Sequence, residues 1–436
     1  MGASDSTANS PGSARVRFEN LVPFTDRATL HYDLRSAPLY GACLGVMTLL
    51  PWVVKETFGG SAWEVAVLSA APPMGHLLDL YWAHHCTHRR KMPWVVWPGM
   101  ISRLLIILVG VAVNSSMVVL FGVLSYIVGS VAVPAVSSIL RTNYPGTRRY
   151  RVVGVVMGLS SLTMALVAGG AGLLLRYAGD DKLLFRPIFI IGGVLGMLGV
   201  WVYSRIKVRG ERHLAHADPV PAGRFSFFRD IGLLWRRPKF GKYQLIQFTS
   251  GFANIMTLPA LVELLKYQDV GWLAAAIVLG VAPNLTRALS MPFYGRLLQK
   301  LNPMQARAIF SVFWTTAYVL IALSGLQVAW VVAARLIMGL AHGATMLLWT
   351  LQQMYFARKR DVPKFMGVHC TLTGLRGLIA PFFGAWLMYR LNSQHAVFGL
   401  SALLAAAAGY LSLRLAVHEK RTTNHTGHVD GGGVEE

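Results

Sequence analysis

Apolar runs as long as a membrane is thick recur along almost the entire chain. A helix needs roughly 20 apolar residues to cross the ~30 Å hydrocarbon core of a bilayer. Such runs, with Gly and Pro tolerated inside them, fall near 38–55, 64–83, 93–113, 117–140, 152–175, 187–206, 243–265, 272–294, 306–326, 328–350, 365–388 and 396–417. The sequence therefore predicts an all-α membrane protein with about twelve transmembrane helices.

Composition agrees with a lipid environment. Hydrophobic residues make up 54% of the chain and charged residues only 14%, whereas soluble domains carry about 25% charged residues. The chain has three cysteines, an odd number, and they are scattered along it, so the sequence predicts no disulfide framework. The first thirty residues contain no apolar stretch of signal-peptide length, so we expect the first span to direct insertion.

The basic residues that produce the net charge of +22 lie mainly in the loops between the spans. If the N-terminus is cytoplasmic, the five cytoplasmic loops hold 24 Lys and Arg and the six outer loops hold 6. This asymmetry is the positive-inside pattern of membrane proteins. It predicts a multi-pass protein of the cell inner membrane with both termini in the cytoplasm, and it removes the need for a nucleic-acid partner.

The spans divide into two groups of six. We expect a partly disordered cytoplasmic segment at 1–35, six-helix bundles at 36–206 and 243–417, a cytoplasmic linker at 207–242 and a disordered tail at 418–436. A short repeat supports the division, because Pro72-x-x-Gly75-x-Leu77-Leu78 matches Pro292-x-x-Gly295-x-Leu297-Leu298. Internal repeats of this kind are common in secondary transporters.

The loop after the second span carries a recognisable motif. It reads Gly75-His76-Leu77-Leu78-Asp79 and is followed by Arg89-Arg90-Lys91, which resembles the G-x-L-x-D motif of the major facilitator superfamily. The resemblance implies two six-helix bundles, a central cavity and alternating access. It also implies that Gly75, Asp79, Arg89 and Arg90 form a conformational latch against the other half.

Arginines lie deep inside four of the spans. An ionisable residue there costs about 2.5–3.5 kcal/mol on insertion scales, so each one is a candidate functional residue. The four are Arg103, Arg287, Arg335 and Arg376. No carboxylate occurs at comparable depth, because Glu64, Glu263 and Asp79 all fall near span ends. The imbalance predicts an anionic partner from outside the protein.

Spans 10 and 11 carry the sharpest pattern. Arg335 and His342 are seven residues apart, and so are His369 and Arg376, which places each pair on one helix face. We expect the arginines to bind a carboxylate or phosphate and the histidines to titrate near neutral pH. The predicted substrate-binding residues are Arg335, Arg376, His342, His369, Arg287 and Asn254.

These residues also admit simpler interpretations. Arg335 or Arg376 would equally satisfy carbonyl oxygens freed by a break in a neighbouring helix. Arg103, on a span that is peripheral in the family arrangement, is expected to snorkel or to bind lipid. The run His84-His85-Cys86-Thr87-His88 has no second cluster at structural-zinc spacing, so we expect a solvated loop, no metal site and no cofactor.

Three functions remain open at this level. The first is a monomeric secondary transporter of a small organic or phosphorylated anion, whose partners are the solute and the lipid bilayer. The second is an exporter of drugs or hydrophobic compounds, which would show aromatic and Met residues in its cavity. The third is a membrane scaffold or assembly factor with a blocked cavity. The sequence lacks G-x-x-x-x-G-K-[ST], H-E-x-x-H and G-x-S-x-G motifs, so we do not expect an enzyme.

Overall fold

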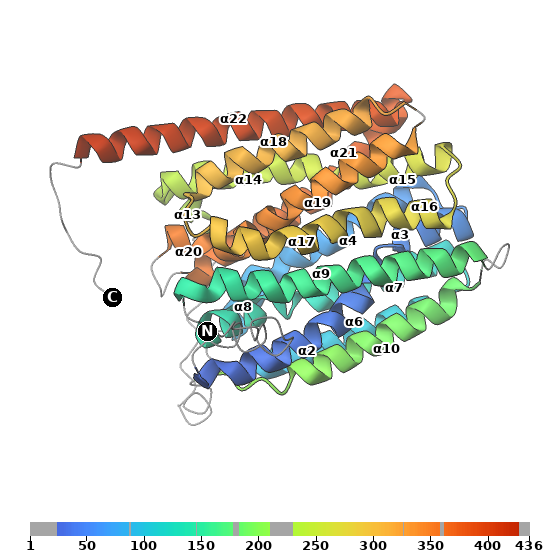
Figure 1. Cartoon of the computed structure of the whole chain (residues 1–436), viewed down its shortest axis with the longest axis horizontal. Helices are drawn as coiled ribbons and strands as arrows, with labels where there is room; N and C mark the ends of the chain where they lie inside the picture. The colour runs from blue at the N-terminus through green and yellow to red at the C-terminus, as the bar shows by residue number, and fades with distance from the viewer. Residues whose placement is uncertain are drawn as a thin grey trace, which may run out of the picture.

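The computed structural model describes residues 24–86, 89–144, 146–177, 183–209, 230–325, 327–357 and 362–426. Within these residues all regular structure is helical, as the apolar runs predict. The helices lie roughly parallel in one bundle (Figure 1). The described α2 begins and α22 ends at the same end of this bundle, which we call the terminal end (Figure 1).

The first half contains the predicted spans 1 to 6. Several spans consist of two or three helical segments in succession. The segments are α2 (Phe24–Met47), α3 (Leu50–Trp52), η1 (Val53–Thr57), α4 (Ala62–Gly75), η2 (His76–Leu78), α5 (Asp79–Cys86), α6 (Lys91–Val109), α7 (Ser115–Ser130), α8 (Val133–Asn143), α9 (Gly146–Tyr177) and α10 (Phe185–Tyr203).

The second half repeats the pattern. A short α13 (Leu233–Arg236) precedes it. The remaining segments are α14 (Pro238–Ile255), α15 (Thr257–Tyr267), α16 (Trp272–Ala276), η3 (Ile277–Val281), α17 (Ala282–Leu297), α18 (Pro303–Ala322), α19 (Val328–Leu351), α20 (Gln353–Phe356), α21 (Val362–Leu391) and α22 (Gln394–Thr426). The η1 and η3 segments are π-helical, so both halves have an irregular turn.

Eleven helical stretches of the described chain are long and apolar enough to cross a membrane. The second predicted span, from α4 to α5, is not one of them. Glu64, Asp79 and the paired Pro72 and Pro73 lower its apolar character. It nevertheless packs against α7 and α21 inside the bundle, so it takes the place of a spanning helix.

The ends of the chain are more helical than the sequence predicted. Part of the expected N-terminal segment already belongs to α2, which begins at Phe24. The expected disordered tail from 418 is helical to Thr426, because α22 continues past its apolar stretch. Most of the predicted linker, 210–229, lies outside the described residues, and so do 427–436.

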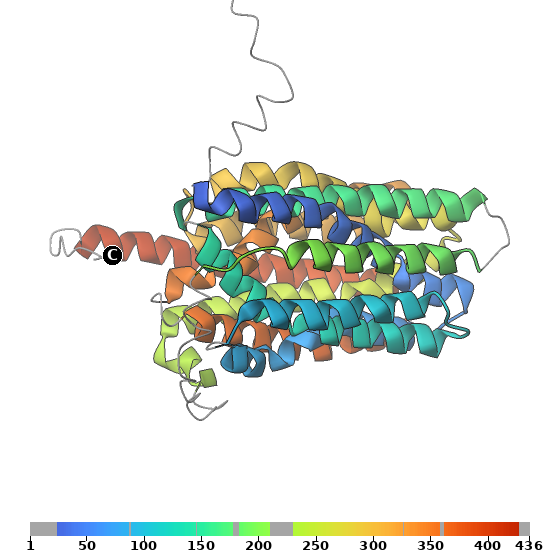
Figure 2. The same ribbon diagram turned by 90° about the horizontal axis from the view of Figure 1, so that it is seen from below.

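The two halves meet along two pairs of helices. Within the first half, α2 packs against α9 and α10, and within the second half α18 packs against α22. Between the halves, α4 packs against α21 and α9 against α17. Figure 2 shows the same bundle from a perpendicular direction, with α22 extending beyond the other helices at the terminal end.

Small residues allow these contacts to be close. A Cβ atom on Gly374 of α21 would lie 2.5 Å from the backbone nitrogen of Leu77, and one on Gly154 of α9 would lie 2.9 Å from the carbonyl oxygen of Met291. Helix backbones in membranes approach each other at such positions. The interface between the halves is therefore a backbone-to-backbone contact at these points.

Candidate functional site

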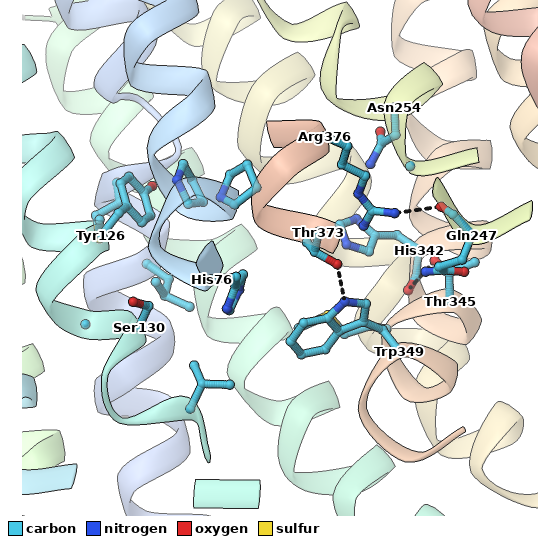
Figure 3. A pocket seen from close by; sticks show the side chains of 18 of the residues that line it. His76, Tyr126, Ser130, Gln247, Asn254, His342, Thr345, Trp349, Thr373 and Arg376 are labelled. Atoms are coloured by element: carbon cyan, nitrogen blue, oxygen red, sulfur yellow. Dashed lines mark hydrogen bonds between the residues drawn. The ribbon is translucent and has the colours of Figure 1, made fainter. Parts of the chain in front are cut away.

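A cavity of about 470 Å³ lies between the two halves. Its lining residues come from α2, α4, η2, α6, α7 and α8 of the first half and from α14, α18, α19 and α21 of the second. In Figure 3 the first-half residues His76, Tyr126 and Ser130 lie on one side, while His342 and Arg376 lie on the other. The volume suits a small molecule, because ligand pockets commonly measure about 300–1,000 Å³.

The lining of this cavity is positively charged. Three arginines contribute to it, Arg103, Arg307 and Arg376, together with His76 and His342. None of the described residues that line it is Asp or Glu. The cavity therefore has the excess of cationic side chains that the deep arginines predicted. Arg307 lines it, however, and Arg287 and Arg335 do not.

Arg376 lies on α21 and is 6% exposed. Its Nη1 donates a 2.6 Å hydrogen bond to the carbonyl oxygen of Gln247 (Figure 3). The guanidinium lies where a side chain at Gly251 of α14 would stand, so the glycine makes room for it. Its Nε has no protein acceptor. Arg376 also lines the cavity, so its charge lies beside that space.

Arg307 lies on α18 and is 3% exposed. The sequence placed Arg307 at the boundary of the span predicted near 306–326 and counted it with the preceding cytoplasmic loop, whereas α18 begins at Pro303 and carries Arg307 into the bundle. Its Nε and Nη2 have no protein acceptor, while the guanidinium interacts with the hydroxyl of Tyr243. The Asn302-Pro303 helix start was the signal that would have placed Arg307 inside the helix.

Arg103 lies on α6 at the opposite wall of the cavity. Its Nη1 donates to the Ser102 hydroxyl at 2.8 Å, and its guanidinium lies 5.2 Å from the centroid of the Tyr40 ring. The expectation that Arg103 faces lipid is therefore corrected. A cation over an aromatic face is a favourable arrangement, and here it faces the space between the halves.

Arg335 has a different environment from the one predicted for substrate binding. Its Nε donates to the carbonyl oxygen of Val278 at 2.8 Å and its Nη2 to that of Leu279 at 3.4 Å. Both carbonyls belong to the π-helical η3, where the regular helix hydrogen bonding is interrupted. Arg335 does not line the cavity, so the simpler interpretation, that it satisfies freed carbonyls, describes this structure.

Arg287 also lies outside the cavity lining. From α17 it reaches across to the first half, where its Nε donates to the Ser161 hydroxyl at 2.8 Å and its Nη2 approaches the Met164 sulfur at 3.0 Å. Both partners belong to α9. In this conformation Arg287 therefore joins the two halves rather than facing the cavity.

Of the two predicted histidines, one lines the cavity and the other does not. His342 lines the cavity beside Trp314, at a ring-centroid distance of 6.0 Å. His369 does not line it, because its Nδ1 is paired with Oε1 of Gln244 at 2.9 Å in the interior. Asn254 lines the cavity and accepts a hydrogen bond from Tyr318. Of the six predicted binding residues, the structure brings Arg376, His342 and Asn254 together at the cavity.

The residues of the predicted latch also have distinct positions. The carbonyl of Gly75 accepts a hydrogen bond from the Ser130 hydroxyl, which ties α4 to α7 within the first half. Asp79 is buried, pairs with His76 and faces Cys370 on α21 of the second half. Arg89 and Arg90 are exposed. Only Asp79 among these four is placed against the other half in the described structure.

At the end of the bundle opposite the terminal end, two ion pairs join the halves. Nζ of Lys55 lies 2.6 Å from Oε1 of Glu263, and Nζ of Lys266 lies 2.8 Å from Oε2 of Glu56. Lys55 and Glu56 belong to η1, and their partners belong to α15. Nearby, Trp63 of α4 stacks on Tyr389 of α21. The cavity is therefore closed off at this end by contacts between the halves.

Comparison with known families identifies the fold. The family model described as Major Facilitator Superfamily matches residues 37–283 and 244–431, which together span both halves. The chain belongs to the major facilitator superfamily. No curated protein matches it. As a member of this superfamily it is a multi-pass membrane protein and a secondary transporter.

Membership of the major facilitator superfamily gives the two halves a functional meaning. In alternating access, two bundles expose a site between them first to one side of the membrane and then to the other. The cavity lies between the halves, and contacts such as those of Lys55 and Glu263 must break for one side to open. The cavity arginines therefore lie in the space between the two halves.

Proposed function

We propose that this major facilitator protein carries a small organic or phosphorylated anion across the membrane by alternating access. The cationic cavity supports this proposal above all, since Arg103, Arg307 and Arg376 line it and its described lining includes no carboxylate. We also propose that the terminal end faces the cytoplasm of the inner membrane, in line with the positive-inside pattern.

The chemistry of the three arginines favours an anion. A guanidinium binds carboxylate or phosphate oxygens through two parallel N–H groups, which gives both charge and geometry. Nε of Arg376, Nε of Arg307 and Nε of Arg103 have no protein acceptor. A buried charge without a partner is costly, so an anion that binds in the cavity compensates the charge of these arginines.

A second function is favoured by another part of the same lining. The rings of Tyr40, Tyr126, Trp314 and Trp349 contribute to the cavity. Aromatic side chains of this kind suit an exporter of hydrophobic compounds. The three arginines would repel a lipophilic cation, so this alternative is restricted to neutral or anionic aromatic compounds.

Transport by the purified protein in liposomes tests the proposal. Uptake and efflux are measured for a panel of carboxylates, phosphate esters and neutral aromatic compounds. For an accepted anion, Arg376→Met should lower transport by about 10- to 100-fold, because a hydrogen bond to a charged group contributes about 1.5–3 kcal/mol. Arg376→Lys keeps the charge without the planar fork and should lie between this variant and the wild type.

The matched control is Arg414→Met, which removes an exposed arginine on α22 that stands over Tyr410. It should leave transport unchanged. Full anion transport by a folded Arg376→Met variant would contradict the proposal. Transport of neutral aromatic compounds without any accepted anion would favour the exporter instead.

A further inference from the structure

Three side chains that commonly bind metals meet where the two halves touch. His76 of η2 and Asp79 of α5 belong to the first half, and Cys370 of α21 belongs to the second. One ligand atom of each lies within 4.8 Å of the others, and Nδ1 of His76 is 2.7 Å from Oδ2 of Asp79. Neither the spacing in the sequence nor the anion-binding cavity accounts for this cluster.

We propose that His76, Asp79 and Cys370 bind a divalent transition-metal ion such as Zn²⁺, which then links the two halves of the transporter. An imidazole nitrogen, a thiolate sulfur and a carboxylate oxygen are the usual protein ligands of Zn²⁺. Tetrahedral ligands at about 2.0–2.3 Å from the ion lie about 3.3–3.8 Å from one another. To hold the ion, separations near the 4.8 Å limit must shorten by about 1 Å, whereas Nδ1 of His76 and Oδ2 of Asp79 must move apart by about 0.6 Å.

The cluster is buried and incompletely satisfied by the protein. Asp79 and Cys370 are each 1% exposed. The Cys370 thiol, a weak donor, hydrogen-bonds to the Asp79 carboxylate, but no N–H or O–H reaches Oδ1 of Asp79. A buried carboxylate oxygen without such a donor is costly. A metal ion coordinated to Asp79 and Cys370 removes this cost, and the thiol releases its proton to solvent on binding.

The site has an entry path and balanced charge. His76 lines the cavity, so an ion and a water molecule for the fourth coordination position reach the cluster from there. The cationic lining disfavours a free cation, but one thiolate and one carboxylate neutralise both charges of a bound Zn²⁺.

The position of the cluster gives the ion a regulatory effect. Around it, α21 contacts the first half closely, with Gly367 against Leu80 and Gly374 against Leu77. An ion bound by both halves stabilises this contact and opposes its separation. This consequence rests on alternating access, whereas the metal binding itself does not.

Zinc binding to the purified full-length protein tests the site. Competition with a chromogenic chelator gives the affinity and the number of ions per chain. We expect one ion in the wild type and a loss of affinity of at least tenfold in Cys370→Ser, His76→Gln and Asp79→Asn. Zn²⁺ should also raise the Tm of the wild type by at least about 2 °C but not that of Cys370→Ser.

Two controls separate this cluster from other ligands. Cys86→Ser, next to His84 and His85, and His342→Gln, in the cavity, should bind Zn²⁺ like the wild type. Cys370→Ser changes a single atom, so it carries the test even if Asp79→Asn does not fold. Unchanged affinity in monodisperse Cys370→Ser, or lost affinity in Cys86→Ser, would overturn the proposal. Failure of anion transport would not affect either readout.

Discussion

At the end opposite the termini, charged side chains of η1 and α15 pair across the two halves, whereas near the terminal end α21 lies directly on η2 and α5 through its glycines. The charged groups at the first end are partly exposed, with side-chain exposures from 17% to 41%. At Gly374, by contrast, the α21 backbone lies so close to Leu77 that there is no room for a Cβ atom.

The two kinds of closure respond to different changes. A partly exposed ion pair loses little free energy when it opens, because water replaces the partner. A close helix contact depends on shape, and an added methyl group disrupts it. Alternating access requires the two ends to open in turn, so their relative stability decides which state predominates. Each of the following variants alters one end and leaves the other intact.

The largest effect is expected for Gly374→Ala. The new methyl group would lie 2.5 Å from the backbone nitrogen of Leu77, which cannot move aside as a side chain could. Overpacking of this kind costs about 1–3 kcal/mol and occasionally more, and the backbone neighbour places this site at the upper end. The Tm should fall, and Cys370 should react faster with a thiol reagent because α21 has moved away from α5.

Gly170→Ala is the matched control for this change. Gly170 lies on α9, and a Cβ there would meet no heavy atom within 4 Å. This variant should unfold at the wild-type temperature or slightly above it, since Ala favours a helix over Gly. Equal Tm values and equal labelling of Cys370 in the two variants would show that the terminal-end contact tolerates a side chain.

Next in size is the reversal of the more buried ion pair. Lys55→Glu places two carboxylates together at a site where each partner is 17% exposed. The expected cost of about 1–3 kcal/mol lies between the values for exposed and buried pairs. The end of the bundle that carries this ion pair should open more often. A thiol reagent detects the opening through a cysteine introduced at Leu261, a buried position of α15.

The double variant Lys55→Glu/Glu263→Lys provides the control for this reversal. It restores opposite charges in the same place, so both the Tm and the labelling rate should return toward the wild type. If the double variant is as perturbed as the single one, the two side chains act through something other than their mutual attraction.

The contrast between the ends also shows what the sequence could predict. Hydropathy gave the spans, and the motif around Gly75 and Asp79 pointed to a contact with the other half. A helical period gives the face and depth of a residue but not the neighbour that the face meets. The seven-residue spacing therefore placed Arg335 and His342 on one face of a helix, but it could not show that Arg335 binds a carbonyl of η3.

Other residues could not be assigned because their positions depend on irregular local structure. The π-helical turn of η3 exposes carbonyls that no periodic pattern predicts, and these bind Arg335. Arg307 depended on where α18 begins, because the span predicted near 306–326 left it at the boundary, whereas the helix begins at Pro303 and carries it to the cavity. The meeting of Asp79 with Cys370 required the packing of two halves, so spacing could not reveal it.

The smallest effect is expected at the second ion pair, Lys266 with Glu56. These side chains are 41% and 30% exposed, so replacing Lys266 with Gln should cost less than about 1 kcal/mol. The loss should shrink further from 20 mM to 500 mM salt, because the screening length falls below the separation of most exposed charges. Tm values at the two salt concentrations measure it, with Arg414→Gln on α22 as the control.

Lys266 and Lys55 alternate with the two glutamates across the same contact, so the pairs should also couple. The combined variant Lys55→Gln/Lys266→Gln should therefore lose a different amount of stability from the sum of its parts. A salt-independent loss larger than that of Lys55→Gln would reverse the ranking and show that exposure does not determine how these charges hold the halves together.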